Sequence, residues 1–347
     1  MGRIIDKELW EHINKYFKVY LPISRGASKH TIRAYQKAIE TFLDFVKKQK
    51  KVELNSVTFD MLNSDILLDF LNDIEEQGAS VSTRNHRLNS IKAFFAYVAK
   101  VDTTKIIYKC DIDKVPLKKK VVERVNYLSE IAVKTLLDEP DVKTMKGIRD
   151  SFIMLLMYDT AARLNGIVNL SICDIKLSKT PVVTLHEKGS KINTVPIMTS
   201  TVEHFSNYMS IYHPDESLYS KEPLFYSLKD GVKKKIDDST IRKFMKKYGV
   251  SAREKCKEIP ENIHPHLLRH SRAMHLYQHG MDLTLVSQWL NHSKLETTLI
   301  YAHADTEQKR KAIELATSGD SPLKDQLNSN KFVVDDEDML KRLYGLK

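Results

Sequence analysis

Apolar positions recur at helical spacing through the first hundred residues. They lie three or four apart in four stretches, which predict helices at about 6–19, 29–48, 64–76 and 82–99. Ser28 stands where it can cap the second helix, and Gly78 follows the third and ends it. Four amphipathic helices of this length predict a helical domain over residues 1–105, with its apolar faces packed together.

The pattern changes between residues 106 and 126, where apolar positions show little periodicity. Lysines concentrate there, and Pro116 interrupts any regular element. We interpret this stretch as a linker between two domains. A charged run is usually only solvated, but a basic linker can also lie along a phosphate backbone.

Residues 127–316 predict a second domain of mixed structure. Ser129 can cap a short helix, and residues 146–160 form a strongly apolar one. Two β-prone runs follow at 181–185 and 192–197, and they predict a hairpin with Lys188 at its tip. The remainder to about residue 316 reads as helical. The predicted fold class is therefore mainly α with a small antiparallel β-sheet.

Composition places the chain among soluble globular proteins with a polyanionic partner. Of its 347 residues, 42% are hydrophobic and 29% are charged, and the formal net charge is +10. Such a positive excess favours nucleic acid as the partner. No run of 18 apolar residues and no apolar signal core occur, so we expect a cytoplasmic protein. The three cysteines lie too far apart in the sequence to frame disulfides or to cluster as metal ligands.

Basic residues in the last third of the chain predict a phosphate-binding site. His266, Arg269 and His292 fall within 36 residues that end at Tyr301, and Arg163 lies upstream. A guanidinium presents a fixed fork of donors that matches two phosphate oxygens, whereas an ammonium does not. Two such forks, Arg163 and Arg269, can stabilise a pentavalent phosphoryl transition state without a metal ion.

The same region contains the groups that a covalent mechanism needs. His266 and His292 can donate hydrogen bonds or move the proton of a nucleophile. Tyr301 can attack the phosphorus and form a phosphotyrosyl intermediate, although a free phenol has a pKa near ~10 and needs nearby cations to ionise. Lys188, at the hairpin tip, can protonate a departing 5′-hydroxyl.

Each of these residues also has a plainer explanation. A single helical histidine is usually structural, a lone tyrosine usually packs in a core, and Lys188 in a turn is by default solvated. Histidines at positions 264, 266, 270 and 275 invite a zinc site, but no glutamate follows His266 as the metalloprotease pattern requires. The conjunction of all six residues in one order favours the phosphate site, and we expect neither a metal ion nor a cofactor.

Several segments around these residues resemble a known family. Residues 264–280 and 288–303 are similar to the C-terminal signature of the tyrosine recombinases, the phage-integrase family that includes Xer- and Cre-like enzymes. Residues 160–175 resemble the segment that holds the family's first catalytic arginine, and residues 183–197 resemble its β-hairpin lysine region. The resemblance implies catalytic roles for Arg163, Lys188, His266, Arg269, His292 and Tyr301.

The resemblance also implies a domain organisation. Residues 1–105 look like the family's four-helix core-binding (SAM-like) domain, which the linker at 106–126 joins to a tyrosine-recombinase catalytic domain at 127–316. Residues 317–347 form a tail with a short amphipathic helix at 335–344. In relatives a C-terminal helix docks on the neighbouring protomer, and we expect this tail to do the same. The alternative is a tail that is disordered or packs on its own protomer.

Two positions depart from the family pattern. Family members commonly carry an acidic residue three positions after the first catalytic arginine, but this chain has Gly166 there. Either another group supports Arg163, or the arginine is held less firmly and the enzyme is slower. Asn291 replaces the glycine of the usual Leu-Gly-His, which is a mild change because asparagine also tolerates unusual backbone angles.

The expected activity is site-specific recombination of double-stranded DNA through a 3′-phosphotyrosyl intermediate. Strand exchange implies self-association to a tetramer on two DNA sites, with an accessory protein as a further possible partner. Integration, excision or transposition of a mobile element is the expected role, and Xer-like resolution of chromosome or plasmid dimers is the alternative. A type IB topoisomerase-like enzyme and a catalytically silent DNA-binding regulator remain as rivals.

Helix position predicts DNA contacts in the first domain, and the basic run predicts them in the linker, although a solvated helix face or a solvated charge run explains the same residues. These contacts are Arg33 and Lys37 on the second helix, Arg84, Arg87 and Lys92 on the fourth, and Lys118, Lys119 and Lys120 in the linker.

Overall fold

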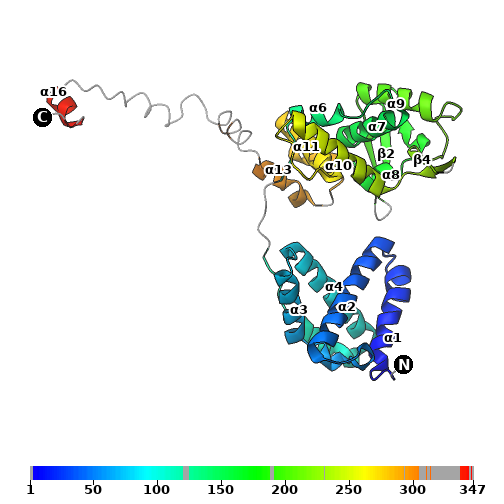
Figure 1. Ribbon diagram of the computed structural model, residues 1–347, viewed down its shortest axis with the longest axis vertical. Helices are drawn as coiled ribbons and strands as arrows, with labels where there is room; N and C mark the ends of the chain where they lie inside the picture. Colours follow the sequence, from blue (N-terminus) through cyan, green and yellow to red (C-terminus); the bar gives the residue numbers. More distant parts are fainter. Residues whose placement is uncertain are drawn as a thin grey trace. The chain divides into compact units, whose positions relative to one another are not determined.

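The chain folds into two compact units, Met1–Val122 and Glu123–Lys347 (Figure 1). The computed structural model describes residues 3–119, 125–187, 191–229, 231–292 and 294–304, together with 310, 313, 337–343 and 345. Within these ranges no helix is both long enough and apolar enough to cross a membrane.

The first unit is a helical bundle, as the apolar periodicity predicted. Its helices are α1 (Lys7–Lys15), continued by the π-helix η1 (Tyr16–Ser24), α2 (Lys29–Lys50), α3 (Ser64–Glu76), α4 (Val81–Val101) and α5 (Ile106–Asp113). Short 3-10 turns occupy Leu54–Ser56, Phe59–Met61 and Thr103–Lys105. Ser28 caps α2 by accepting a hydrogen bond from the Thr31 N–H. Gly78, just beyond α3, has a φ of 91°, which glycine adopts without strain.

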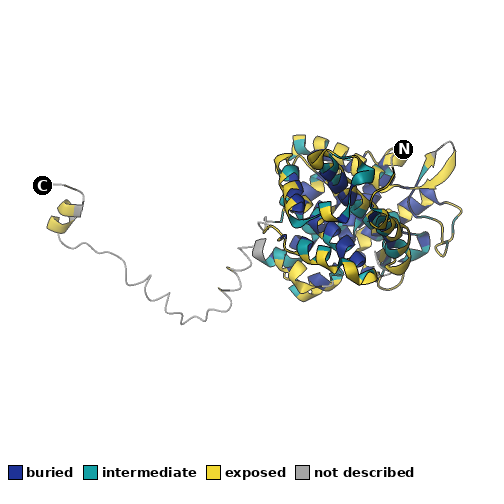
Figure 2. Ribbon diagram, turned by 90° about the horizontal axis from the view of Figure 1, so that it is seen from below, coloured by how far each residue is buried: buried dark blue, intermediate teal, exposed yellow. Residues whose placement is uncertain are grey.

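Aromatic side chains fill the core of this unit. Phe42 and Phe70 pack with ring centroids 5.3 Å apart, and Tyr16 meets Phe94 edge to face at 5.4 Å. All four side chains are at most 2% exposed. The buried residues line the inward faces of the helices (Figure 2), so the predicted amphipathic pattern accounts for the packing.

The linker between the two units is shorter than the predicted range 106–126, because residues 106–115 belong to the first unit. Residues Ile106–Asp113 form α5, which packs on α4, and both Ile112 and Val115 are buried in the core of the first unit. The Asp111 carboxylate accepts hydrogen bonds from the Ser64 N–H at 2.7 Å and the Ser64 hydroxyl at 3.1 Å. The prediction was wrong for residues 106–115 because a helix of only eight residues is too short for its apolar positions to show a clear periodicity.

The second unit contains helices around a three-stranded antiparallel sheet in the order β1-β2-β3. The strands are β1 (Ile175–Lys176), β2 (Val182–Glu187) and β3 (Lys191–Pro196), followed by the separate hairpin of β4 (Tyr226–Lys229) and β5 (Val232–Lys235). The helices are α6 (Glu130–Leu137), α7 (Met145–Thr160), α8 (Leu164–Val168), α9 (Thr199–Tyr212), α10 (Asp238–Lys255), α11 (Pro265–Gln278), α12 (Leu283–Trp289), α13 (Leu299–Ala304) and α16 (Glu337–Leu343). Short 3-10 turns occupy Ile172–Asp174 and Leu295–Thr297.

The structure confirms the hairpin and the fold class but corrects one element. Strands β2 and β3 pair with Val183 opposite Val195, and both side chains are buried. Residues 188–190 at the hairpin tip, including Lys188, lie outside the described residues. The prediction that the rest of the domain is helical missed the β4–β5 hairpin. All of β5 is exposed, so it lacks the alternating apolar positions that identify a strand in the sequence.

Helix α7 forms the centre of the second unit. It packs against α6, α8, α9 and α11, and Figure 1 shows it behind the paired helices α10 and α11. Phe152, Ile153 and Leu156 are all at most 1% exposed, as a helix surrounded by others requires. A buried ion pair also lies on α7: Nε and Nη2 of Arg149 donate to Oδ1 of Asp150 at 3.0 and 2.7 Å.

Candidate active site

Four segments of the second unit carry five of the six residues that we predicted as catalytic. Arg163 is the N-cap residue of α8 and lies three residues after the last residue of α7. His266 and Arg269 lie on α11, which Pro265 begins at its first position. His292 follows α12, and Tyr301 lies on α13. Lys188, the sixth, lies outside the described residues.

Arg269 joins two of these segments through hydrogen bonds to their backbones. Its Nη1 donates to the carbonyl of Ala161 at 2.7 Å, and its Nη2 donates to the carbonyl of Leu290 at 2.6 Å. The side chain is only 5% exposed. One carbonyl lies two residues before Arg163 and the other two residues before His292, so a single guanidinium holds both predicted residues near α11. The spacing of residues in the sequence does not predict that Arg269 connects these two segments.

His292 is held by the turn after α12. Asn291 has a φ of 48°, which confirms that this position needs a residue tolerant of the left-handed region. The turn aims Nδ1 of His292 at the buried Thr298 hydroxyl, 2.8 Å away. Burial, and then the charges of Arg269 and Arg163, lower the His292 pKa to about 4. At neutral pH His292 is therefore an uncharged hydrogen-bonding group.

Tyr301 is almost fully buried, with an exposed fraction of 1%. Its ring packs in an apolar cluster with residues such as Met274, Val286 and Leu290. Its hydroxyl oxygen lies 2.9 Å from Nδ1 of His270. Burial raises the pKa of Tyr301 to about 12, although Arg269 and Arg163 act in the opposite direction. The phenol therefore keeps its proton at neutral pH.

The charges of Arg269 and Arg163 act on each of the other three described residues that we predicted as catalytic. Burial lowers the pKa of His266 below its usual value, and the charges of Arg269 and Arg163 lower it further. The same two charges act on Tyr301 and His292, so these three residues all lie within electrostatic range of Arg269 and Arg163. A compact group of two guanidiniums, neutral imidazoles and a phenol suits the binding of a phosphate.

The structure corrects part of the predicted DNA-contact set. Arg84 is only 5% exposed, and its Nε lies 3.1 Å from Oε2 of Glu75 on α3. The prediction that Arg84 faces solvent was therefore wrong. Nζ of Lys92 donates to the carbonyls of Asp113 and Val115 at 3.1 and 2.6 Å. Both cations stabilise the packing inside the first unit, because α3, the end of α5 and the residues after it bring oxygen acceptors to them.

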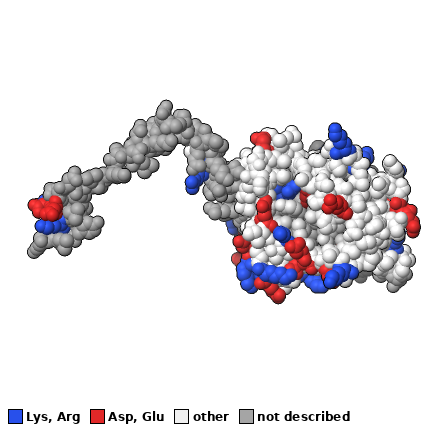
Figure 3. All heavy atoms as spheres, turned by 90° about the horizontal axis from the view of Figure 1, so that it is seen from above, with Lys and Arg blue, Asp and Glu red and all other residues white. Residues whose placement is uncertain are grey.

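The other predicted DNA contacts differ in their exposure to solvent and in their partners within the protein. Arg33 and Lys119 are exposed. Lys37 pairs with a neighbouring glutamate on α2 at 3.2 Å, and Lys118 pairs with Glu75 at 2.9 Å. Arg87 is partly buried and donates to the Thr41 hydroxyl at 2.5 Å. Lys120 lies outside the described residues. On the face drawn in Figure 3, most of the described surface is neither acidic nor basic, and Lys and Arg side chains gather along its lower edge with Asp and Glu among them.

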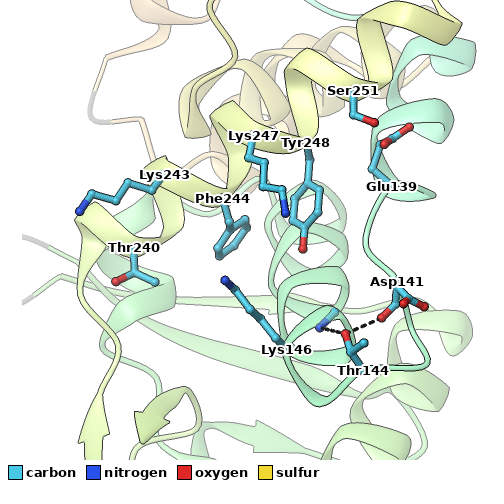
Figure 4. Close-up of a pocket in the computed structure, with 11 residues that line it drawn as sticks. Glu139, Asp141, Thr144, Lys146, Thr240, Lys243, Phe244, Lys247, Tyr248 and Ser251 are labelled. Carbon is cyan, nitrogen blue, oxygen red and sulfur yellow. Dashed lines mark hydrogen bonds between the residues drawn. The ribbon is translucent and has the colours of Figure 1, made fainter. Parts of the chain in front are cut away.

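A cavity of about 600 Å³ lies elsewhere in the second unit, between the start of α7 and α10. Figure 4 shows Lys146, Lys243 and Lys247 around it, together with Tyr248. None of the predicted catalytic residues lines it. Among the described residues, no group of three or more His, Cys, Asp or Glu side chains is placed to hold a metal ion. The chemistry of the residues, not the size of a cavity, locates the candidate site.

Gly166 replaces the expected acid and leaves room for a side chain. It is buried in α8, and a Cβ there would lie 3.6 Å from Cδ2 of Leu185, an ordinary contact. Gly166→Ala should therefore raise the free energy of unfolding by up to about 1 kcal/mol, because helical glycine is entropically costly. Urea unfolding measures this change.

The matched control for Gly166→Ala is Gly249→Ala on α10. A Cβ at Gly249 would lie 2.5 Å from Cγ1 of Ile263, so that variant should lower the free energy of unfolding. A loss of stability in Gly166→Ala equal to that of the control would contradict the packing described for α8.

Comparison with known proteins identifies the family to which the chain belongs. Residues 126–308 match the model of the phage integrase family, and residues 13–100 match the N-terminal SAM-like domain of phage integrases. Tyrosine recombinase XerD of Staphylococcus epidermidis is 28% identical over 298 residues, which cover 84% of this chain and 94% of XerD. XerD of Staphylococcus aureus is 27% identical over 302 residues, or 86% of this chain and 96% of that protein.

Two solved structures share the fold. The XerH site-specific recombinase bound to its difH substrate is 20% identical, with a TM-score of 0.61 and 90% of each chain covered. The Tn1549 transposon integrase in complex with circular intermediate DNA is 16% identical, with a TM-score of 0.64 over 88% of this chain and 98% of the integrase. With more than half of its length matched by the catalytic model, the chain belongs to the phage integrase family of tyrosine recombinases, enzymes that cleave and rejoin DNA.

Proposed function

We propose that this protein is a site-specific DNA recombinase in which Tyr301 is the nucleophile. Its phenolic oxygen attacks a DNA phosphate, forms a 3′-phosphotyrosyl link and releases a 5′-hydroxyl, which then joins to a partner strand. The observation that carries the proposal is the bridge from Arg269 to the carbonyls of Ala161 and Leu290. It gathers the segments of Arg163 and His292 around the helix that contacts Tyr301.

Positive charge is the main contribution of the protein to this reaction. The guanidiniums of Arg163 and Arg269 bind the non-bridging oxygens and stabilise the charge of the pentavalent transition state. His266 and His292 donate hydrogen bonds to the same phosphate, and Lys188 protonates the leaving 5′ oxygen. The phosphotyrosyl link conserves the energy of the broken bond, so the proposed reaction needs neither ATP nor a metal ion.

The proposal is tested by trapping the covalent intermediate. A nicked duplex that carries DNA from the ends of the encoding element or locus lets the cleaved fragment diffuse away after attack. Incubated in EDTA, the wild type should give a protease-sensitive DNA adduct on a denaturing gel. Tyr301→Phe should bind the duplex equally well and give no adduct.

The control for this experiment is another Tyr→Phe change. Tyr219 is 90% exposed and lies outside the site, so Tyr219→Phe should form the adduct at the wild-type rate. An adduct that survives in Tyr301→Phe would refute the proposed nucleophile. Bound DNA without any wild-type adduct would favour a silent DNA-binding regulator instead.

As a biological role we propose integration, excision or transposition of a mobile element. The absence of the usual acid at Gly166, the long tail after residue 316 and the fold shared with a transposon integrase support it. The relatives named XerD support the alternative, resolution of chromosome or plasmid dimers. Amplification across a circularised junction of the flanking DNA, dependent on the intact gene, would favour the mobile element. Accumulation of chromosome dimers after deletion of the gene would favour the alternative.

We further propose that the protein acts as a tetramer on two DNA sites and that its tail contributes to assembly. Helix α16 (Glu337–Leu343) exposes Met339, which is 51% exposed, and the surrounding residues 314–336 lie outside the described residues. Deletion of residues 326–347 should reduce formation of the two-site complex in a native gel and leave binding to one site largely intact. Unchanged two-site complexes would exclude docking of the tail on a neighbouring protomer.

A further inference from the structure

The Tyr301 hydroxyl has a hydrogen-bond partner outside the six residues predicted from the sequence. Its oxygen lies 2.9 Å from Nδ1 of His270, and the two ring centroids are 5.9 Å apart. His270 follows Arg269 directly on α11. The helix that holds the proposed phosphate-binding guanidinium therefore also holds an imidazole against the proposed nucleophile.

The ionisation states of the two groups favour the phenol as the donor. Burial lowers the His270 pKa to about 4, helped by electrostatic interaction with His266 and by the charge of Arg269. Burial raises the Tyr301 pKa to about 12. At neutral pH a protonated phenol thus faces a neutral imidazole, which accepts at one nitrogen. Arg269 and Arg163 favour the ionised phenol, and this makes the phenol the better donor of the pair.

Other histidines near the site have different contacts. Nδ1 of His292 is bonded to the Thr298 hydroxyl at 2.8 Å. On α11, His275 bonds through Nδ1 to the Tyr158 hydroxyl at 2.8 Å and through Nε2 to the Leu128 carbonyl at 2.9 Å. The geometry therefore favours His270, whose Nδ1 lies within hydrogen-bond distance of the Tyr301 hydroxyl, as the base for the nucleophile.

We propose that Nδ1 of His270 accepts the phenol proton of Tyr301 as the oxygen attacks the DNA phosphate, and returns that proton when the strand is rejoined. The inference rests on the proposed role of Tyr301 as the nucleophile. In the forward step the Oη–P bond forms, the P–O5′ bond breaks and the proton moves to His270. The leaving oxygen takes a proton from the general acid, for which we propose the Lys188 ammonium. Rejoining reverses each transfer, so atoms and charges balance.

Binding of DNA makes this transfer easier. The positive charge of Arg269 contributes to the low pKa of His270 in the free protein. A phosphate dianion-like transition state at Arg269 offsets that charge, which favours the imidazolium that the transfer creates. The base would therefore become stronger at the moment when the phosphate is in place.

The experiment measures the rate of adduct formation on a nicked duplex whose leaving oxygen is replaced by sulfur. A thiolate leaves without a general acid, so the rate reports only on activation of the nucleophile. His270→Ala removes the acceptor, and His270→Asn keeps an oxygen acceptor that cannot take up the proton at neutral pH. Both variants should be slower than the wild type by about 10²-fold or more. Added imidazole should restore part of the rate of His270→Ala.

His275→Asn is the matched control, because it removes an imidazole that also bonds a tyrosine hydroxyl from the same helix. Thermal melts and DNA-binding titrations show whether each variant is folded and bound. With these equal to the wild type, His275→Asn should keep its rate on the sulfur substrate. A near wild-type rate in His270→Asn, or no rescue of His270→Ala by imidazole, would overturn the proposal and leave His270 as a positioning residue.

Failure of this inference is distinct from failure of the proposed function. A wild-type adduct that Tyr301→Phe abolishes and that the His270 variants form at full rate supports Tyr301 as nucleophile and refutes His270 as its base. An adduct that Tyr301→Phe still forms refutes both.

Discussion

Arg269→Ala is expected to lower the rate of covalent DNA adduct formation by on the order of 10³-fold or more. The variant loses a guanidinium that would stabilise the transition-state charge, and a single such donor commonly contributes a factor of this size. It also loses the hydrogen bonds to the carbonyls of Ala161 and Leu290. Arg163 and His292 would then be held less firmly, so the two losses act in the same direction. Single-turnover cleavage of the nicked duplex measures the effect.

Arg269→Lys separates charge from geometry in this prediction. An ammonium keeps the positive charge but cannot reach both carbonyls with a planar fork. We expect Arg269→Lys to be folded and to bind DNA, yet to remain at least 10²-fold slower than the wild type, as an order-of-magnitude estimate. A lysine variant as fast as the wild type would show that positive charge alone suffices and that the hydrogen bonds to the two carbonyls do not contribute to the rate.

Asp150→Ala is expected to lower the free energy of unfolding of the second unit by about 3–5 kcal/mol, because it leaves a buried arginine without its partner. Asp150 is fully buried and accepts two hydrogen bonds from Arg149 through one oxygen. The Tyr248 hydroxyl donates to the other oxygen at 3.1 Å. Urea unfolding followed by a probe in the second unit measures the change, since two units need not unfold together.

An exposed ion pair in the same unit is the matched control for Asp150→Ala. Arg242 and Asp238 lie 3.4 Å apart on α10, and both side chains are 54% exposed. Because water screens such a pair, Arg242→Ala should change the free energy of unfolding by less than about 1 kcal/mol. Equal effects of the two variants would contradict the burial of the pair on α7.

Local patterns in the sequence were sufficient to predict most of the secondary structure. The four N-terminal helices, the apolar helix α7 and the β2–β3 hairpin appear where their periodicity predicted them. Ser28 and Ser129 cap helices as predicted, through hydrogen bonds from Thr31 and Ala132. These features depend on residues a few positions apart, so a single sequence contains the information.

The errors lie where a distant segment decides the environment of a residue. Arg84 looked like an exposed cation because α4 alone cannot reveal Glu75, which α3 brings to it. Residues 106–115 looked like linker because the core that buries Ile112 and Val115 comes from other helices. Local charge and periodicity cannot predict such partners, since the contacts form only when the helices pack.

For the candidate site too, the sequence predicted some features and the tertiary structure decided the others. The residue types and their order along the chain predicted six catalytic candidates, because phosphate chemistry needs guanidiniums, imidazoles and a nucleophile. They are Arg163, Lys188, His266, Arg269, His292 and Tyr301. Their order did not reveal that Arg269 bridges the ends of two other segments, or that His270 meets a hydroxyl 31 positions away. Both contacts depend on how α11 packs against α7, α12 and α13. The amino-acid sequence by itself thus determined which chemical groups are available. The packing of helices distant in the sequence decided which of these groups lie within hydrogen-bond distance of one another.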